Sequence, residues 1–505
     1  MPSALLEGCD DSPFEAAEQA TDAAFVLHDR LYAYTREDRL AKMLAAQATA
    51  TTLIDHAEAA AGRTGCRRTQ ARIWYLRGKA AACGREGHNS AHAERLLGDA
   101  VKLEPTLVCA WNALGECYWQ RGDLEEARGC FIGALAHEVN ATSLCHLSML
   151  LRMHVEEPQL AAERILESLD LAKEAVRLEP CSPKAWSCLG CALLSSYAHG
   201  GGKLFDELHQ AHRAFVVACK SADAANSVPA YADATKATDV ADAANAANAT
   251  DVADPDPDLL MNHALAHFLL DDIDAAIACY GAAHALDPTL GGDARRQEAW
   301  EHACHVQELL QANGGLRDKR LAQLLAELPP PSPIVAPPSP PAPVASLARL
   351  VLGANPRASL NPFSPFVTPH FPHLSHPIFS PLIPPPPPPQ LHEQARVLVK
   401  LLAPLPSHPS RRHHCYTVAD KDRAIMALAV YATGPALEPG VTLELYEPTL
   451  VQVRVRREHS LAGSSAPNPQ RELAYKLLRV EQPATQLRVR IHGDTRVRLT
   501  RDTDT

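Results

Sequence analysis

The sequence contains no uninterrupted run of about 20 apolar residues, so we expect no membrane-spanning helix. Its opening segment, MPSALLEGCDDSPFE, has neither a basic start nor an apolar core, and we therefore expect no secretory signal peptide. The chain also lacks a glycine-rich phosphate loop, the turn that carries a hydrolase nucleophile and the helix motif of zinc proteases. These absences predict a protein that is not an enzyme and that uses no cofactor.

Charge and cysteine usage narrow the class of protein further. The net charge of -11 arises from 48 Lys and Arg against 59 Asp and Glu, which disfavours a dedicated nucleic-acid binder. Fourteen cysteines lie singly along the chain without the spacings of a disulfide framework. This distribution is typical of a reducing compartment and predicts a cytoplasmic and nuclear protein.

Two groups of residues have the composition of a metal site. Cys188 and Cys191 are spaced as C-x-x-C, but no second pair accompanies them, so we interpret them as buried small residues of a helix. His413, His414 and Cys415 are consecutive, and because no further ligands can be nominated, we expect them in a loop. The sequence therefore predicts no metal site.

One segment of the chain carries a repeat signature. Its spacing is W-x2-L-G-x2-Y, followed by A-x3-F and a final Ala, given by Trp111, Leu114, Gly115, Tyr118, Ala127, Phe131 and Ala134. This is the pattern of a tetratricopeptide (TPR) unit, a helical hairpin of roughly 34 residues. Gly115 is expected to let the paired helix approach closely. Because one hairpin cannot cover its own apolar face, neighbouring hairpins are required.

Matching units lie on both sides of this segment. We place five of them, at residues 71–105, 108–141, 142–180, from 183 onwards, and at 257–288; the third lacks the Trp and the Gly. They predict a solenoid over residues 65–328, whose last part, 294–328, forms capping helices. Residues 1–64 are predicted to form a helical region before it. Residues 221–256, rich in Ala, Asp, Asn and Thr, have too little apolar surface to repay ordering and are predicted to be an insertion.

Residues 329–390 are too rich in proline for a packed helix or a central strand. One interpretation is a polyproline linker. Another concerns residues 356–390, where Pro, Ser, Phe and Leu dominate and the stretch closes on six prolines and Gln390. These residues can be encoded by pyrimidine-only codons, as in a translated intron that ends in a polypyrimidine tract. Both interpretations stay open.

The hydrophobic period changes from helical to alternating after Gln390. Residues 395–402, 424–431, 441–446, 450–456, 475–480 and 487–491 are predicted strands. Residues 391–505 hold 17 Lys and Arg against 12 Asp and Glu, as an oligonucleotide-binding (OB) barrel often does, although arginines that alternate with apolar residues are more simply the solvent face of strands. The predicted fold is therefore mainly α, a TPR superhelical solenoid followed by a small all-β, OB-like barrel over 391–505.

Several runs, taken in order, carry a more specific resemblance. They are KLEPTLVCAWNALGECYWQRGDLEEA, NATSLCHLSMLLRM, DPDLLMNHALAHF, HALDP, DKRLAQLLAEL and DRAIMALAVYATG. They resemble the tetratricopeptide repeat protein 5 (Strap) family over residues 65–328 and, more weakly, over 391–493. The resemblance implies a factor that recognises the Met-Arg-Glu N-terminus of nascent tubulin at the ribosome and triggers decay of tubulin mRNA through an mRNA-decay adaptor. It also implies a second role, as a nuclear scaffold for acetyltransferase coactivator complexes in stress responses.

The resemblance also implies functional positions. The arginine of LSMLLR is Arg152 and the aspartate of DPDLxxN is Asp258, both expected to bind the peptide. The lysine of VKLEP is Lys102, expected to contact the ribosome. A family glutamate after the ALDP turn has no identical match, and Asp293 can serve only if the alignment slips by one residue.

The repeat pattern supports these positions without the family name. The first helix of each TPR hairpin lines a groove. Counting positions from the repeat pattern predicts that the residues facing this groove are Asn112, Glu116, Trp119, Arg152, Asp258, Asn262 and Leu265. Arg152 can hold a carboxylate with two hydrogen bonds and Asp258 can accept a guanidinium, although either could also be a solvated surface charge. Asn262 is expected to orient the peptide backbone or to make a hydrogen bond along its own helix.

Two other TPR functions compete with this one. A chaperone partner would clamp an acidic C-terminus with several inward Lys, Arg and Asn, yet the inward positions here include Glu116, Cys191 and Asp258. The chaperone alternative is therefore disfavoured. The nuclear scaffold alternative stays open, because scaffolding leaves little local signature.

Overall fold

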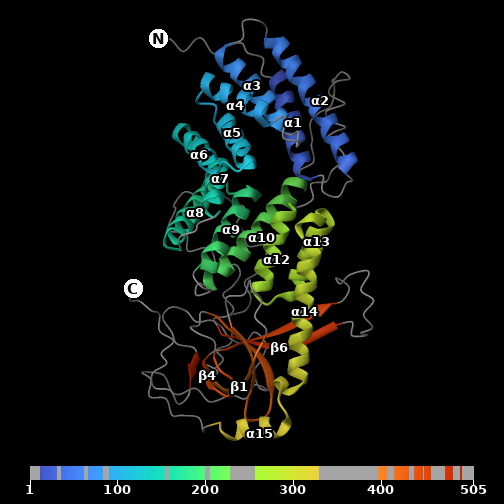
Figure 1. Cartoon of the computed structure of the whole chain (residues 1–505), viewed down its shortest axis with the longest axis vertical. Coiled ribbons are helices and arrows are strands. Elements are labelled where there is room, and N and C mark those ends of the chain that lie inside the picture. The colour runs from blue at the N-terminus through green and yellow to red at the C-terminus, as the bar shows by residue number, and fades with distance from the viewer. Residues whose placement is uncertain are drawn as a thin grey trace. The chain divides into compact units, whose positions relative to one another are not determined.

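The computed structural model of the chain (Figure 1) describes residues 12–30, 36–61, 66–82, 90–153, 158–199, 205–227, 256–328, 396–405, 414–431, 437–446, 448–456, 472–480 and 489–491. The chain divides into two compact units. The first comprises residues 1–196, 210–263 and 279–293, and the second comprises 197–209, 264–278 and 294–505. Within the described ranges, none of the helices combines the length and the apolar character that crossing a membrane requires. A mainly α fold with a separate C-terminal sheet confirms the predicted fold class.

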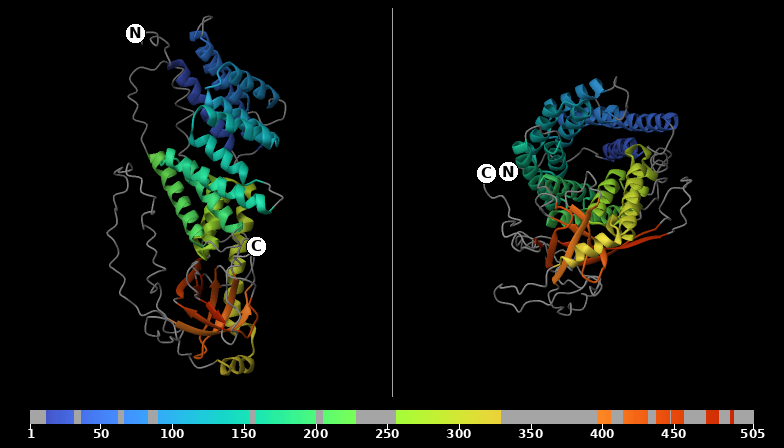
Figure 2. Two further views of the ribbon diagram at one scale, coloured as in Figure 1. Left: turned by 90° about the vertical axis from the view of Figure 1, so that its left-hand side faces the viewer. Right: turned by 60° about the horizontal axis from the view of Figure 1, so that its bottom comes forward.

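The helices follow one another in pairs along the chain. They are α1 (Ser12–Arg30) and α2 (Arg36–Ala61), α3 (Arg67–Ala82) and α4 (Ser90–Leu103), α5 (Val108–Arg121) and α6 (Leu124–His137), α7 (Ala141–Leu151) and α8 (Pro158–Leu178), α9 (Pro183–His199) and α10 (Phe205–Ser227), and α12 (Pro257–Leu269) and α13 (Ile273–Leu286). In the first unit, α1 to α8 pack pair by pair, and α4–α5 and α6–α7 contacts join successive pairs. Figure 2 shows these hairpins stacked in chain order, coloured from blue to green.

A glycine on the first helix of a hairpin admits a large side chain from the second helix. A Cβ added at each of three glycines would lie only 2.5 to 2.7 Å from the facing side chain, in the pairs Gly78 and Leu97, Gly115 and Phe131, and Gly190 and Phe215. Real Cβ atoms do not approach this closely. The role predicted for Gly115 is therefore confirmed, and the same contact recurs in three hairpins.

The tryptophan of the pattern ties each hairpin to the turn before it. The indole Nε1 of Trp111 donates to the carbonyl of Pro105 and that of Trp186 to the carbonyl of Pro180, each at 2.8 Å. The third hairpin lacks this tryptophan and begins differently. There the side chain of Asn140 accepts the Ser143 N–H at 2.8 Å and caps α7.

Two predicted segments fall partly or wholly outside the described residues. The insertion predicted at 221–256 begins inside a helix, because α10 continues to Ser227, and residues 228–255 lie outside the description. The proline-rich segment 329–390 also lies outside it. The N-terminal region forms the helical pair α1 and α2.

The second unit contains one seven-stranded sheet. Its strands are β1 (Arg396–Pro404), β2 (His414–Ala419), β3 (Ile425–Val430), β4 (Thr442–Tyr446), β5 (Thr449–Arg456), β6 (Glu472–Val480) and β7 (Val489–Ile491). The order across the sheet is β5-β6-β3-β2-β1-β4-β7, and only the β3–β6 pair among these described strands is parallel. One expectation was wrong: His414 and Cys415 begin β2, whose residues from Cys415 to Ala419 are all buried and belong to the core of the sheet.

Two strands that are consecutive in the chain lie near opposite ends of the sheet order. The strands β4 and β5 are consecutive in the chain, yet β4 pairs with β1 and β5 pairs with β6, far along the order. Figure 1 shows the strands, orange to red, curved around one another. Arg454 and Arg456 are exposed while Val453 and Val455 are buried, as the solvent-face interpretation predicts. The further identification as an OB fold stays a prediction.

Helices after the repeats pack on this sheet. They are α14 (Gly292–Gln311), the short η3 (Asn313–Gly315) and α15 (Asp318–Ala326). Leu321 and Leu325 of α15 form one apolar cluster with Leu402 and Ala419 of the strands. The segment expected to cap the solenoid, 294–328, thus shares a core with the sheet inside the second unit.

A buried tyrosine fixes the sheet to the turn between α12 and α13. The Tyr431 hydroxyl donates to Asp271 Oδ2 at 2.6 Å and lies 3.1 Å from the Leu269 carbonyl oxygen. Asp271 is 5% exposed and adopts a φ of 61°, which few residues other than glycine and asparagine tolerate. The Arg479 guanidinium donates to the Leu270 carbonyl in the same turn. One turn of the chain is therefore held from β6 and from the residue that follows β3.

Candidate functional site

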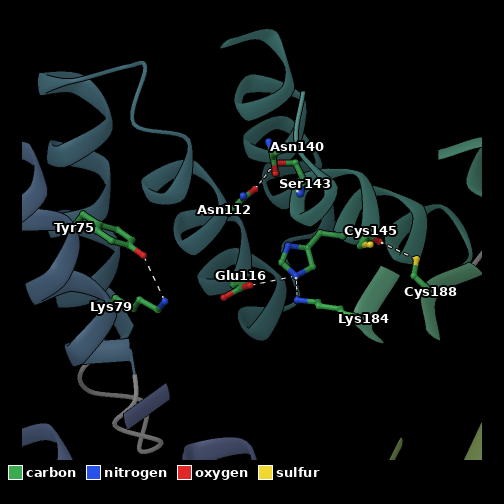
Figure 3. Close-up of polar contacts among 10 residues, drawn as sticks. Tyr75, Lys79, Asn112, Glu116, Asn140, Ser143, Cys145, Lys184 and Cys188 are labelled. Carbon is green, nitrogen blue, oxygen red and sulfur yellow. Dashed lines mark hydrogen bonds and ion pairs between the residues drawn. The ribbon is translucent and has the colours of Figure 1, made fainter. Parts of the chain in front are cut away.

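Polar side chains join the first helices of successive hairpins in the first unit. We call them the cross-repeat pairs. Each links a residue one place after the repeat position of the tryptophan, which is Cys145 in the third hairpin, to a residue two places before that position in the next hairpin. The pairs are Tyr75 and Cys109, Asn112 and Ser143, and His146 and Lys184. The Ser143 hydroxyl donates to Asn112 Oδ1 at 2.7 Å, and Lys184 Nζ lies 2.9 Å from His146 Nε2. Figure 3 shows the contact of Asn112 with Ser143 and, in the next hairpin, Lys184 beside the imidazole ring.

The His146 imidazole belongs to the last of the cross-repeat pairs. It is 4% exposed and its ring lies 4.9 Å from that of Phe131 and 6.1 Å from that of Trp119. Its Nε2 contacts Glu116 Oε1 at 3.2 Å as well as Lys184. The Glu116 contact favours a charged ring, but burial and then the positive charge of Lys184 lower the pKa of His146 to about 3. Desolvation dominates at so buried a position, so the ring is neutral at physiological pH.

Arg152 is anchored through one of its nitrogens. It lies at the C-terminus of α7, and its Nη1 donates to Ser148 Oγ at 3.2 Å, Ser168 Oγ at 3.3 Å and the Cys188 carbonyl at 3.2 Å. The other two nitrogens, Nη2 and Nε, take no part in these three hydrogen bonds. The side chain is half-buried. The anchored guanidinium therefore keeps one edge available for an acceptor that binds two N–H groups.

A pair of cysteines packs beside this anchor. Cys188 on α9 lies against Cys145 on α7, and its Sγ is 3.5 Å from Ser148 Oγ and 3.7 Å from the Cys145 carbonyl oxygen (Figure 3). The neighbour of Cys188 is thus a cysteine of the preceding hairpin. The C-x-x-C spacing with Cys191 has no part in this contact.

The charges of Arg152 and Asp258 influence the thiol of Cys191 in opposite directions. Burial raises the pKa of the Cys191 thiol to about 12; the charge of Arg152 opposes that rise, and the charge of Asp258 adds to it. Asp258 is an exposed residue in the first turn of α12. Two opposite charges predicted from sequence therefore act on the same side chain of the intervening helix α9.

The other predicted residues lie elsewhere. Asn262 donates from Nδ2 to the Asp258 carbonyl at 2.9 Å, which is the hydrogen bond along its own helix that the sequence left open. Asp293 lies half-buried in the first turn of α14, beside Gly292, where an added Cβ would meet the Tyr280 carbonyl oxygen at 2.7 Å. The side chain of Lys102, in the last turn of α4, is 78% exposed and pairs with Asp99 at 3.3 Å.

Sequence reasoning missed His146 and Lys184. The signal that could have found them is the repeat position two places before the pattern tryptophan. Cys109, Ser143 and Lys184 occupy it in successive hairpins, and Asp258 occupies it in the last. The register of the third hairpin is hard to assign, because that hairpin lacks both the tryptophan and the glycine.

Comparison with known proteins identifies relatives over about half of the chain. No protein-family model matches the chain. It is similar to proteins named tetratricopeptide repeat protein 5. The one from Mus musculus is 32% identical over 268 residues, 53% of this chain and 54% of that protein. Those from Bos taurus and Homo sapiens are 32% and 33% identical over 243 residues, 48% of this chain and 49% of each protein. The predicted resemblance is confirmed over this length, and the chain spans about half the length of the curated relatives it matches.

Solved structures similar to the chain include two that are described as TPR proteins. The Thermus thermophilus protein TTC0263 is 17% identical, with 46% of this chain and 99% of that chain covered and a TM-score of 0.32. The Cut9–Hcn1 hetero-tetramer of the APC/C gives 14% identity, 59% and 51% coverage and a TM-score of 0.37. YrrB, described as a TPR protein with an unusual peptide-binding site, gives 16% identity, 43% and 87% coverage and a TM-score of 0.25. Scores this low carry no argument about function.

Proposed function

We propose that the first helices of the hairpins bind an extended peptide in which neighbouring residues carry opposite charges. The observation that supports this most is the anchored Arg152, whose Nη1 makes three hydrogen bonds while its other edge stays available to a carboxylate. Asp258 supplies the opposite charge on α12, and both charges act on Cys191. A peptide with an arginine beside a glutamate is complementary to this pair.

The Met-Arg-Glu N-terminus of nascent tubulin has this order of charges, and similarity to tetratricopeptide repeat protein 5 supports it as the ligand. On this proposal the protein acts in the cytoplasm at the ribosome and leads to decay of tubulin mRNA. Lys102 contacts ribosomal phosphate in this arrangement, since its exposed ammonium at the end of α4 is available for a salt-sensitive contact.

Peptide titration tests the charged pair. Arg152→Ala and Asp258→Ala should each weaken binding of a Met-Arg-Glu peptide by about 1 to 3 kcal/mol, because one charged partner loses its counterpart. Calorimetric titration measures the affinity, and circular dichroism checks that the helices persist. Arg164→Ala on the second helix α8 is the matched control and should bind like the parent. Unchanged affinity in both site variants would remove the basis for the proposal.

Ribosome co-sedimentation tests Lys102 separately. Lys102→Glu should spare peptide binding but lower the fraction that pellets with ribosomes, and the difference from the parent should shrink as salt rises. Lys173→Glu provides a matched change, because Lys173 likewise pairs with an aspartate three residues earlier, at 3.3 Å. If Lys102→Glu pellets like the parent at low salt, Lys102 is only a solvated charge.

A further inference from the structure

Two residues compete for hydrogen bonding to one nitrogen of the His146 ring. Lys184 Nζ lies 2.9 Å and Glu116 Oε1 lies 3.2 Å from the same Nε2. A neutral imidazole nitrogen either accepts a hydrogen bond or donates one. Lys184 can only donate, and an ionised Glu116 can only accept. Nε2 therefore serves one of the two residues at a time.

The lysine contact decides the tautomer of the free protein. The ammonium needs the lone pair of Nε2, which places the imidazole proton on Nδ1. Within the described part of the chain, Nδ1 is buried and has no hydrogen-bond partner. A buried N–H group without a hydrogen-bond acceptor costs free energy. The contact between Lys184 and His146 therefore carries this cost, and Lys184 can give it up for another acceptor.

The two charged ends that meet at Nε2 are complementary to an amide. Lys184 is exposed and has N–H groups beyond the one given to His146, and the Glu116 side chain is 25% exposed. A carboxylate bound here would be repelled by Glu116, and an ammonium bound here would be repelled by Lys184. An amide group has one acceptor and one donor, and so it can accept from Lys184 while it donates to Glu116.

The repeat positions place this pair with the ligand site proposed above. Lys184 occupies in its hairpin the position that Asp258 occupies in the last one. Glu116 occupies in α5 the position of Cys191 in α9, the residue on which Arg152 and Asp258 both act. Lys184 is also one helical turn before Cys188, whose carbonyl anchors Arg152.

We propose that Glu116 and Lys184, held together by His146, bind a backbone peptide group of the ligand and so fix its register relative to Arg152. This rests on the proposed peptide-binding function. A backbone group is present whatever the ligand's side chains are, so the site positions the chain while Arg152 and Asp258 select its charges. His146 acts through the other two residues and is a positioning residue.

An ester scan tests the assignment on the full chain. Each backbone amide of an eight-residue Met-Arg-Glu peptide is replaced in turn by an ester, which removes the N–H and keeps the shape. One replacement should weaken binding to the parent protein about tenfold or more, as expected for a hydrogen bond to a charged group. In Glu116→Met the same replacement should make no difference. In Glu116→Gln, which keeps an acceptor oxygen, part of the difference should persist.

Variants of the lysine and of a matched surface lysine complete the test. Lys184→Met should weaken binding of the unmodified peptide, and Lys173→Met on α8 should not. Thermal melts show whether each variant folds, and Glu116→Gln keeps the test open if Glu116→Met does not.

The outcomes separate this inference from the proposed function. Loss of peptide binding in Arg152→Ala, without any ester whose effect depends on Glu116, overturns the backbone contact alone. An effect that follows an Asn or Gln side chain of the peptide also overturns it, in favour of side-chain recognition. If the peptide does not bind the parent protein, the proposed function fails and this inference fails with it. An ester effect that depends on Glu116, together with unchanged peptide affinity in Arg152→Ala and Asp258→Ala, supports the backbone contact and contradicts the charged pair.

Discussion

The repeats of the first unit and the sheet of the second unit are held together in different ways. In the repeats, contacts join residues of the same or the next hairpin, as between Ser143 and Asn112, which are 31 residues apart. In the second unit, Tyr431 contacts Asp271 across 160 residues. The first kind of contact recurs with the repeat and leaves a pattern in the sequence, whereas the second occurs once and leaves none.

The two units should differ in how they lose stability. A stack of hairpins that contact only their neighbours can lose stability locally, whereas a sheet whose core comes from distant segments is expected to lose it as one body. The core of the sheet draws on β1 to β6, from Val397 to Val480, and on the apolar face of α15. Substitutions in each unit should therefore differ in how far their effects spread.

The largest effect is expected from Phe131→Ala. The phenyl ring is fully buried against Gly115 and His146, so removing it leaves a cavity in the hairpin that costs about 3 to 5 kcal/mol. Amide hydrogen exchange should show lost protection in α5 to α8 and none in the strands. The neighbouring Ile132, which is 44% exposed, gives the control Ile132→Ala with little change. Equal loss across the sheet would contradict the local character of the repeats.

The second effect concerns the long-range contact. Tyr431→Phe removes the hydroxyl that bonds the buried Asp271, and should cost the second unit about 1 to 3 kcal/mol. The lost protection should extend to the turn after α12 as well as to the strands. Tyr416→Phe is the comparison within the sheet, since its hydroxyl accepts one N–H from Leu437 at 2.9 Å. If Tyr431→Phe affects only the strands beside it, the turn is not held by this hydroxyl.

The sequence predicted the contacts of the repeats better than those of the second unit. The spacing of Trp111, Gly115 and Phe131 predicted a hairpin in which Gly115 lets the paired helix approach closely, because the pattern repeats in other hairpins. The hydrogen bond from Trp111 to Pro105 was not predicted. The strands were found from alternation, except β2, whose start at His414 and Cys415 resembled a loop. The Tyr431 contact could not be found, since nothing near Asp271 in the sequence refers to it. The third hairpin belongs to the repeats but lacks the tryptophan and the glycine of the pattern. Its register was therefore hard to assign, and the pairing of His146 with Lys184 was not predicted.

A third expected effect is a pH dependence in the repeats. The folded-state pKa of His146, about 3, lies below the ordinary value of 6.5, so between these values the unfolded chain binds a proton that the folded chain does not. Stability from the neutral ring is complete above about pH 6.5 and is lost as pH falls toward 3, by at most about 1.4 kcal/mol per pH unit.

Urea unfolding at pH 7, 6 and 5 measures this slope. His146→Gln should lower the slope of unfolding free energy against pH by the contribution of about one proton between pH 6.5 and 3. Lys184→Met removes one of the two causes of the lowered pKa and should narrow the window, while burial keeps part of it. A slope that is the same in the parent and in His146→Gln would mean that His146 is not the group responsible.

The central claim is that charges of opposite sign on α7 and α12 select the order of charges in a peptide. Calorimetric titration of the parent protein with two peptides that differ only in that order, Met-Arg-Glu and Met-Glu-Arg, tests it most directly. The account predicts that the second peptide binds at least about tenfold more weakly, or about 1.4 kcal/mol, because its carboxylate and guanidinium would each meet the wrong partner. Equal affinity for the two peptides would contradict it.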